Sequence, residues 1–336
     1  MIRVLHTVYP PTDQGNPFAS LLVDAVSGET DSSYFSWRAA FLQRWDVVHF
    51  QWPEKFFVGG SRAVAAAKRW RFRAWMQVLR WRRTGIVWTI HNLATHEDPG
   101  ANAARELSRL AQRVDRYVVL NPAVEIPLSA PADIIPHGNY RSLIPDDVRT
   151  DPQGKRLLYF GFIREYKNVP ALVRAFNGSG LDREEFDLRV VGRPHTSELS
   201  RAVESAIIES VGGVGARLEA VTDRELYKEI AHSSVVILPY ADLYNSGVLI
   251  MALSMERPVI VPRTPATEHY REQFGEDWVF LYDSPLDSAT LSEVVRRAID
   301  ASDRGSLDLS ALDWSALASA YLDTYRGALH SGRIRV

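Results

Sequence analysis

The sequence predicts an α/β protein built from two doubly wound, Rossmann-like domains in series. Short apolar runs bounded by turn residues recur along the chain, with helix-compatible segments between them, which is typical of a buried parallel sheet. The pattern is interrupted once, at the polar stretch 146–155, which is rich in Asp, Pro and Gly and indicates a linker. A chain of 336 residues is long enough for two such cores.

The expected strands fall into two groups, one on each side of this linker. In the first half the apolar runs are 2–8, 45–52, 85–91, 116–121 and 133–138. In the second half they are 155–162, 186–192, 216–221, 234–240, 257–262 and 278–283. Near the carboxyl terminus, apolar residues spaced i, i+3, i+4 predict helices in TLSEVVRRAIDA and WSALASAYLDTYRGAL. We therefore expect domains at 1–148 and 149–312, followed by a terminal helix within 313–336.

Composition excludes several functional classes. The net charge of −2 and a pI near 6.5 speak against nucleic acid as a partner. The absence of cysteine removes disulfides, thiolate metal ligands and a cysteine nucleophile, and it fits a reducing cytoplasm. The segment MIRVLHTVYP lacks the apolar core of a signal peptide, and no run approaches the roughly 20 apolar residues of a membrane span. Any membrane contact is therefore expected to be peripheral.

One segment has an unusual composition, with no Asp or Glu between Lys55 and His96. Within it, KRWRFRAWMQVLRWRR interleaves arginine with aromatic residues, and as a helix it places Arg69, Arg73 and Arg80 close together. Three interpretations stay open for this segment. It is an interfacial helix on anionic lipid, using these arginines and Trp75; a surface helix that packs its aromatic face, 72, 75, 76 and 79, on the sheet; or a nucleic-acid patch, although no nucleic-acid motif accompanies it.

In the second half, polar residues follow two expected strands, at the edge where parallel sheets bind ligands. Arg164 and Lys167 follow the strand 155–162 and can neutralise a pair of phosphates; otherwise they form a solvated basic turn. The strand 234–240 ends at Tyr240 and leads into Asn245, Ser246 and Gly247 before the apolar helix VLIMALSM. Ser or Asn here can simply cap the helix, but the glycine also allows close approach of a ligand to the first backbone amides.

In the first half, two loops that follow expected strands are also candidates for ligand binding. The strand 2–8 leads into a loop with Gly15 and Asn16, a weak signal because many turns have this composition. The strand 85–91 ends in HNLATHEDPG, which gathers His91, His96 and Glu97 in one loop. Imidazole and carboxylate groups at a strand end suit general-base catalysis or recognition of substrate hydroxyls, although such a loop can also be solvated. Ligand spacing typical of a metal site is missing from the sequence.

Taken together, these motifs resemble the GT-B glycosyltransferases of the GT4-like group, over nearly the whole chain. The segment YFGFIREYKNVPALVRAF resembles the strand, turn and helix that carry a phosphate-binding lysine in that group. IIPHGNY, DLRVVGRP and SSVVILPYADLYNSGVLIMALSMERPVIVP resemble, in order, its element at the domain junction, its glycine-terminated strand and its donor-binding strand, loop and helix. More narrowly, HFQWPE, TIHNLATHE, GFIREYK and NSGVLIMALSMERPVI resemble bacterial exopolysaccharide β-mannosyltransferases of the xanthan type.

This resemblance implies the GT-B fold, in which two Rossmann-like domains face each other across a cleft and the terminal helix packs back on the N-terminal domain. It implies that a nucleotide-sugar donor, with GDP-mannose favoured, binds the C-terminal domain, and that the acceptor is a lipid-linked oligosaccharide or other glycolipid. The implied donor-binding residues are Arg164, Lys167, Gly192, Arg193, Tyr240, Asn245, Ser246 and Gly247, and the implied cleft residues on the acceptor side are Gly15, Asn16 and His137. No metal or other cofactor is expected, because the cations and the helix N-terminus can stabilise the leaving diphosphate.

The resemblance also implies roles in catalysis. His91 would contact the donor sugar, and an inverting reaction would need a base, for which Glu97 is the first candidate and His96 the second. The basic aromatic helix would hold the enzyme at the inner face of the plasma membrane, where glycolipid acceptors lie.

The sequence departs from the group's pattern at its two glutamates, which are replaced by Leu243 and Met251, and at an arginine, which is replaced by Phe162. These changes put glutamate recognition of the ribose and a retaining outcome in question. Two alternatives therefore stay open: a retaining transferase that uses a UDP-sugar, and a glycosyltransferase-like binding subunit without catalysis. A nicotinamide dehydrogenase is disfavoured, because neither half shows G-x-G-x-x-G between its first strand and helix.

Overall fold

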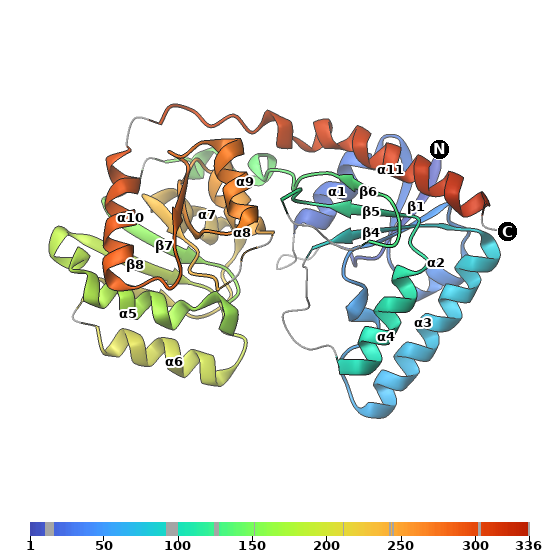
Figure 1. Ribbon diagram of the computed structural model, residues 1–336, viewed down its shortest axis with the longest axis horizontal. Helices are drawn as coiled ribbons and strands as arrows, with labels where there is room; N and C mark the ends of the chain where they lie inside the picture. Colours follow the sequence, from blue (N-terminus) through green and yellow to red (C-terminus); the bar gives the residue numbers. More distant parts are fainter. Residues whose placement is uncertain are drawn as a thin grey trace. The chain divides into compact units, whose positions relative to one another are not determined.

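The structure is a computed structural model that describes residues 1–10, 17–91, 100–123, 128–150, 152–210, 212–241, 243, 245–301 and 304–334. The chain forms two compact units, each built on a parallel sheet (Figure 1). The N-terminal unit contains 1–138 together with 310–336, and the C-terminal unit contains 139–309. The α/β class and the two successive sheets therefore agree with the sequence prediction.

The N-terminal unit has a six-stranded sheet in the order β2-β1-β3-β4-β5-β6. Its strands are β1 (Ile2–His6), β2 (Thr30–Tyr34), β3 (Val47–Phe50), β4 (Gly85–Ile90), β5 (Arg116–Val119) and β6 (Ala132–Ile134). Its helices are α1 (Pro17–Ser27), α2 (Trp37–Leu42), α3 (Arg62–Arg82), α4 (Gly100–Ala111) and α11 (Trp314–Ile334). Strand β1 pairs in parallel with β2 on one side and β3 on the other. The order in which strands are added to the sheet therefore reverses between β1 and β3.

Helix α11 completes the N-terminal unit although it comes from the far end of the chain, and it lies beside α1 and the sheet (Figure 1). Tyr321, Leu322, Tyr325 and Ala328 repeat at helical spacing and are buried. Close packing requires a glycine opposite, because a Cβ at Gly85 would lie 2.9 Å from the Ala328 carbonyl oxygen. The predicted return of the terminal helix is thus confirmed.

The C-terminal unit has a second six-stranded sheet, in the order β12-β11-β10-β7-β8-β9. Its strands are β7 (Lys155–Phe160), β8 (Phe186–Val191), β9 (Val214–Arg217), β10 (Val235–Ile237), β11 (Val259–Pro262) and β12 (Val279–Tyr282). Its helices are α5 (Val169–Ser179), α6 (Ser197–Ile208), α7 (Asp223–His232), α8 (Gly247–Ser254), α9 (Pro265–Phe274) and α10 (Ser288–Asp300). The strand order reverses between β7 and β10, which places a topological switch point at their carboxyl ends.

Two elements and one boundary differ from the sequence prediction. Strand β2 (TDSSY) and helix α2 were not expected, because an edge strand that buries only Thr30 carries no apolar run. The first unit ends at Gly138, before the polar stretch 146–155, which belongs to the C-terminal unit. At this boundary the Asn139 Nδ2 donates a hydrogen bond to the Leu309 carbonyl, 3.2 Å away, where the chain returns.

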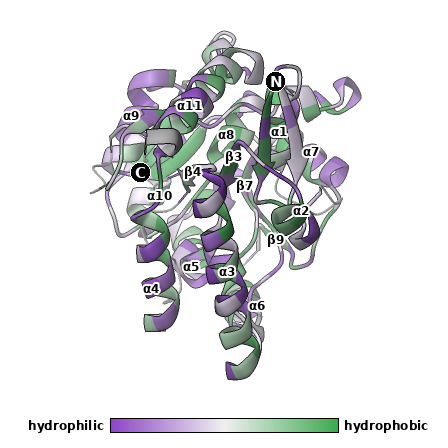
Figure 2. Cartoon of the chain, turned by 90° about the vertical axis from the view of Figure 1, so that its right-hand side faces the viewer, coloured by the Kyte–Doolittle hydropathy of each residue, from purple (hydrophilic) through white to green (hydrophobic). Residues whose placement is uncertain are grey.

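The basic aromatic segment forms helix α3, and the structure shows which of its side chains are buried. Phe72, Trp75, Met76 and Leu79 are buried against the unit, which confirms that they share one face. The expectation that Trp75 contacts lipid is therefore wrong, since its indole is fully buried among Phe35, Phe50 and other rings. Figure 2 looks onto α3 and α4, where hydrophilic and hydrophobic stretches alternate along α3. None of the described helices is long and apolar enough to span a bilayer.

Candidate functional site

The loops after β7 and β10 meet at the switch point of the C-terminal sheet. The loop after β7 contains the single helical turn Glu165–Lys167, and the loop after β10 leads into α8. The Ala241 amide donates to the Tyr166 carbonyl at 2.8 Å, which ties the two loops together. Their aromatic rings also meet, with Tyr166 edge-on to Tyr240 at a centroid distance of 5.9 Å. Residues from both predicted donor-binding motifs therefore lie in one place.

Lys167 is the most informative residue of this site. Only 7% of it is exposed, and its ammonium lies 4.9 Å from the centre of the Tyr240 ring. No carboxylate forms an ion pair with it within the part of the chain that the structure describes. Burial, and then the neighbouring Arg164, lower the pKa of Lys167 to about 8. A buried cation without an acidic partner favours an anionic ligand.

Two glycines keep the space beside Lys167 open. Gly161 has a φ of +109°, and a Cβ there would come within 3.8 Å of the Lys167 ammonium and 3.4 Å of Val248 in the first turn of α8. Gly192, after β8, lies directly against Gly161, because a Cβ on it would be 2.0 Å from the Gly161 carbonyl oxygen. The lysine and the start of α8 therefore approach each other across a backbone that carries no side chain.

The start of α8 is a capped helix N-terminus. The Ser246 hydroxyl accepts a hydrogen bond from the Leu249 amide at 3.1 Å, so the capping interpretation of Ser246 is confirmed. The amides of Gly247 and Val248, in the same first turn, have no carbonyl one turn earlier within the helix to bind. Leu249 through Ser254 are buried, which anchors the helix behind this terminus. A helix N-terminus attracts negative charge, and so does the ammonium of Lys167, so both favour an anion at this place.

Arginines extend the positive charge around Phe162, which replaces the arginine of the family pattern. The guanidinium carbons of Arg164 and Arg193 lie 5.2 and 5.6 Å from the centre of its ring. Leu243 and Met251, which replace the two glutamates, are both buried. Charge at this site therefore comes from cations on the loops after β7 and β8.

The carboxyl edge of the N-terminal sheet has a different chemistry. His91, directly after β4, donates a 2.7 Å hydrogen bond from Nε2 to the Gln51 Oε1, and its ring stacks on Trp52 at 4.2 Å. Burial, followed by the charges of His137 and Lys55, lowers the pKa of His91 to about 3. This imidazole is therefore neutral at pH 7.

Other histidines surround this edge. His6, at the end of β1, and His49, opposite it on β3, are fully buried, and burial lowers the pKa of His6 to about 3. His137, after β6, packs against Phe18 at 4.8 Å, and burial lowers its pKa to about 4. These buried histidines therefore leave this edge of the sheet uncharged rather than cationic.

Four predicted site residues, Gly15, Asn16, His96 and Glu97, lie outside the described residues. Gln51 and Trp52 were missed, although both belong to the quoted motif HFQWPE. A glutamine at a strand end is not distinctive in a single sequence, so no signal in the chain marked it. Among the described residues, no three His, Asp or Glu side chains gather as metal ligands.

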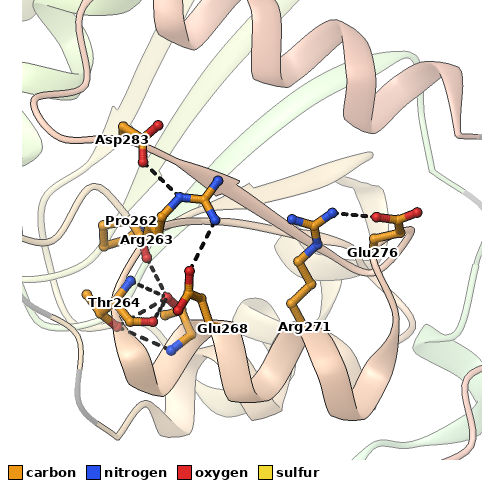
Figure 3. Close-up of polar contacts among 8 residues, drawn as sticks. Pro262, Arg263, Thr264, Glu268, Arg271, Glu276 and Asp283 are labelled. Carbon is orange, nitrogen blue, oxygen red and sulfur yellow. Dashed lines mark hydrogen bonds and ion pairs between the residues drawn. The ribbon is translucent and has the colours of Figure 1, made fainter.

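A separate hollow of about 530 Å³ lies beside α9 in the C-terminal unit (Figure 3). Arg263 bridges Asp283, at 2.8 Å, and Glu268, at 3.2 Å, while Arg271 pairs with Glu276. Both arginines are thus compensated by acids, unlike Lys167. The hollow therefore lacks the excess positive charge that marks the switch point.

Comparison with known proteins places this geometry in a family. Residues 154–300, which include the switch point of the C-terminal sheet, match the family model described as glycosyl transferases group 1. Two curated relatives named GDP-mannose:glycolipid 4-beta-D-mannosyltransferase, from Xanthomonas campestris pv. campestris, are 34% and 33% identical over 98% of this chain and 93% of theirs. The chain belongs to the group 1 glycosyltransferases.

Solved structures agree with this glycosyltransferase at the level of the fold. Sucrose-phosphate synthase from Thermosynechococcus elongatus has a TM-score of 0.69 at 16% identity, covering 96% of this chain and 98% of that one. HepE from Anabaena in complex with UDP-glucose has a TM-score of 0.62 at 10% identity, covering 99% and 98%. The fold is the two-domain GT-B fold of these enzymes, and the protein is a glycosyltransferase.

Proposed function

We propose that this glycosyltransferase moves mannose from GDP-mannose to a glycolipid acceptor and forms a β-linkage, for exopolysaccharide or related glycan synthesis. The names of the two Xanthomonas relatives support the donor and the acceptor class, since the similarity extends over 98% of the chain. Because the mannose of GDP-mannose is α-linked, a β-linked product means inversion at the anomeric carbon. The observation that carries the proposal is Lys167, a buried cation that has no acidic partner among the described residues and lies at the switch point.

In this reaction the bond between the anomeric carbon and the diphosphate breaks, and negative charge grows on the leaving GDP. Lys167, Arg164 and the first amides of α8 stabilise that charge. Arg193 supplies a further guanidinium beside Phe162. These cations do the work that a divalent ion does in other transferases, so we propose that catalysis does not require a metal.

The N-terminal unit handles the sugar and the acceptor in this proposal. His91 contacts the donor sugar as a neutral imidazole, with His137 nearby on the same sheet edge. Glu97, or failing that His96, removes the proton from the attacking acceptor hydroxyl. The proton thus leaves the hydroxyl as its oxygen bonds to the anomeric carbon.

The test is a transfer assay with GDP-mannose or UDP-glucose, a glycolipid acceptor, and either magnesium or a chelator. We expect transfer from GDP-mannose alone, unchanged by the chelator, and a product whose anomeric NMR coupling identifies a β-mannoside. Transfer from UDP-glucose with retained configuration would support the retaining alternative instead. Binding of GDP without turnover of any acceptor would indicate a binding subunit.

We also propose that helix α3 rests on anionic lipid at the inner face of the plasma membrane. Trp70 and Trp81 are 73% and 79% exposed and lie three helical turns apart, opposite the buried face. Arg69 and Arg80 belong to the same helix, which carries no acidic residue, while Arg73 is held by the buried carboxylate of Glu106 on α4. Exposed indoles flanked by arginines suit the headgroup region of a bilayer.

This surface is tested by sedimentation with vesicles that contain phosphatidylglycerol. Replacing Trp70 and Trp81 by Ser is expected to reduce binding, and replacing Arg69 and Arg80 by Gln is expected to make the remaining binding less sensitive to salt. Ile208→Ser is the matched control, because Ile208 is 82% exposed but lies on α6 of the other unit. Equal binding by all variants would contradict the proposal.

A further inference from the structure

A chain of hydrogen bonds runs from the terminal helix to the sugar-facing histidine. The Tyr325 hydroxyl, on α11, lies 2.9 Å from the His49 Nδ1. The His49 Nε2 lies 3.2 Å from the Gln51 Nε2, and the Gln51 Oε1 lies 2.7 Å from the His91 Nε2. Gln51 is 2% exposed and Tyr325 is fully buried, so water does not compete for these bonds.

The amide of Gln51 gives this chain a direction. Its oxygen can only accept, so the His91 Nε2 must carry a proton and donate it. Its nitrogen can only donate, so the His49 Nε2 accepts, and the His49 proton lies on Nδ1 and is donated to the Tyr325 oxygen. The Thr89 hydroxyl, 2.7 Å from the same His49 Nε2, then acts as a donor. In this arrangement the Gln51 amide and the Thr89 hydroxyl share the lone pair of the His49 Nε2.

Packing fixes the plane of the His91 ring as well. Trp52 stacks on it with an interplanar angle of 18°, and Phe18 of α1 meets it edge-on at 5.0 Å and 86°. The Gln51 backbone is itself held, since its amide donates to the Thr7 hydroxyl oxygen at 3.1 Å. The hydrogen bond from His91 to Gln51 and these two aromatic contacts hold the plane of the His91 ring.

We propose that Gln51 is a positioning residue that holds His91 as the neutral tautomer protonated on Nε2, with His49 and Tyr325 holding Gln51. In this tautomer the Nδ1 nitrogen of His91 carries a lone pair and can only accept a hydrogen bond, and an acceptor role toward the sugar rests on the function proposed above. Among the described residues, the titratable groups that act on His91 include Lys55 and His137, with His49 behind Gln51, whereas Phe18 and Trp52 add no charge. Each of these groups disfavours a positive charge on the ring.

The tautomer is measured directly by ¹⁵N NMR of the histidine rings in the wild-type chain, with His91→Asn identifying the His91 signals. We expect a proton on Nε2 and no titration between about pH 5.5 and 8. Gln51→Leu should remove this preference and lower kcat/KM by roughly tenfold, the effect of one hydrogen bond. Gln51→Glu should keep the tautomer but raise the pKa of His91, so that turnover becomes dependent on pH.

Thr84→Val is the matched control. Thr84 is equally buried and donates to the Trp45 carbonyl at 3.1 Å, but it precedes β4 whereas His91 follows it. This variant should leave the His91 signals and the pH profile unchanged. A proton on Nδ1 in the wild type, ordinary titration of His91, or unchanged signals in Gln51→Leu would overturn the proposal. These readings need no turnover, whereas full activity of His91→Asn would refute the proposed role of His91 in transfer.

Discussion

The carboxyl edges of the two sheets differ in charge, although both belong to doubly wound domains. At the C-terminal edge Lys167 is buried, and its pKa falls to about 8. At the N-terminal edge His91 and His137 are buried, and their pKa values fall to about 3 and about 4. The direction of the shift and its main cause, burial, are the same at both edges.

The outcome at pH 7 is opposite, because the two residue types start from different pKa values. Lysine begins near 10.5 and remains mostly protonated after the shift, whereas histidine begins near 6.5 and loses its proton. One edge therefore keeps a positive charge, which suits the diphosphate proposed to bind there, and the other offers neutral groups, which suit the proposed sugar and acceptor hydroxyls. The comparison shows that the same burial leaves a lysine charged and a histidine neutral at pH 7, so the residue type decides the charge of each edge.

Acidification should produce the largest difference between the two units, because it should lower the free energy of unfolding of the N-terminal unit. Because the pKa values of His6, His91 and His137 are depressed in the folded state, their contribution to stability is complete above pH 6.5 and is lost as the pH falls. Below pH 6.5, each of these histidines should lower the free energy of unfolding by about 1.4 kcal/mol per pH unit, and the three together by about 4 kcal/mol per pH unit. The measurement is urea unfolding followed by tryptophan fluorescence. This signal reports mainly on the N-terminal unit, because Trp278 is the only one of the nine tryptophans that lies in the C-terminal unit.

His330→Gln is the control for this measurement, because His330 is exposed on α11 of the same unit. Fluorescence midpoints that do not decrease between pH 7 and about 5 would contradict the neutral, buried state of these histidines.

Gly192→Ala should damage the C-terminal edge alone. The new methyl group would come 2.0 Å from the Gly161 carbonyl oxygen, so backbone must move, at a cost of about 3 kcal/mol. Gly28→Ala is the matched control in the N-terminal unit, since nothing lies within 4 Å of its Cβ position. Thermal unfolding with and without GDP measures both effects, and equal behaviour of the two variants would argue against the close approach.

Lys167→Ala should weaken GDP by about 2 kcal/mol, roughly thirtyfold, and guanosine much less, because a charge-assisted hydrogen bond to the diphosphate is lost. In the wild type, GDP affinity should decrease as the pH rises through about 8, where Lys167 loses its proton. Calorimetric titration measures both. Lys155→Ala is the control, as Lys155 begins β7 at the opposite end and binds the Glu184 carbonyl. Equal losses for GDP and guanosine would remove the phosphate role.

Ser246→Ala should have the smallest effect, about 1 kcal/mol of stability from the lost cap. Thr196→Ala removes an equivalent cap, since the Thr196 hydroxyl accepts from the Leu199 amide at 3.2 Å at the start of α6. Both variants should unfold at similarly lower temperatures, but only Ser246→Ala should also weaken GDP. If both weaken GDP alike, the start of α8 has no special role in the donor site.

Much of the fold could be predicted because buried parallel strands leave long apolar runs, such as 155–162 and 257–262. The edge strand β2 could not, since only Thr30 of it is buried and its pattern is polar. The sequence also predicted that Lys167, Gly192 and Ser246 come together at the switch point, because each follows or precedes an apolar element within a few residues. Trp75 was misplaced, because helical spacing defines a face but not which face turns inward.

The sequence by itself determined the α/β class, the succession of two sheets and the cationic loop after β7, because periodicity and strand-end residues are local properties. Only the tertiary structure decided which side chains lose their charge or their freedom. His49, Gln51, His91 and Tyr325 are distant in the chain and meet only when α11 packs on the N-terminal sheet. Burial and hydrogen-bond direction depend on such non-local neighbours, and they decide that one edge of this enzyme is neutral and the other positive.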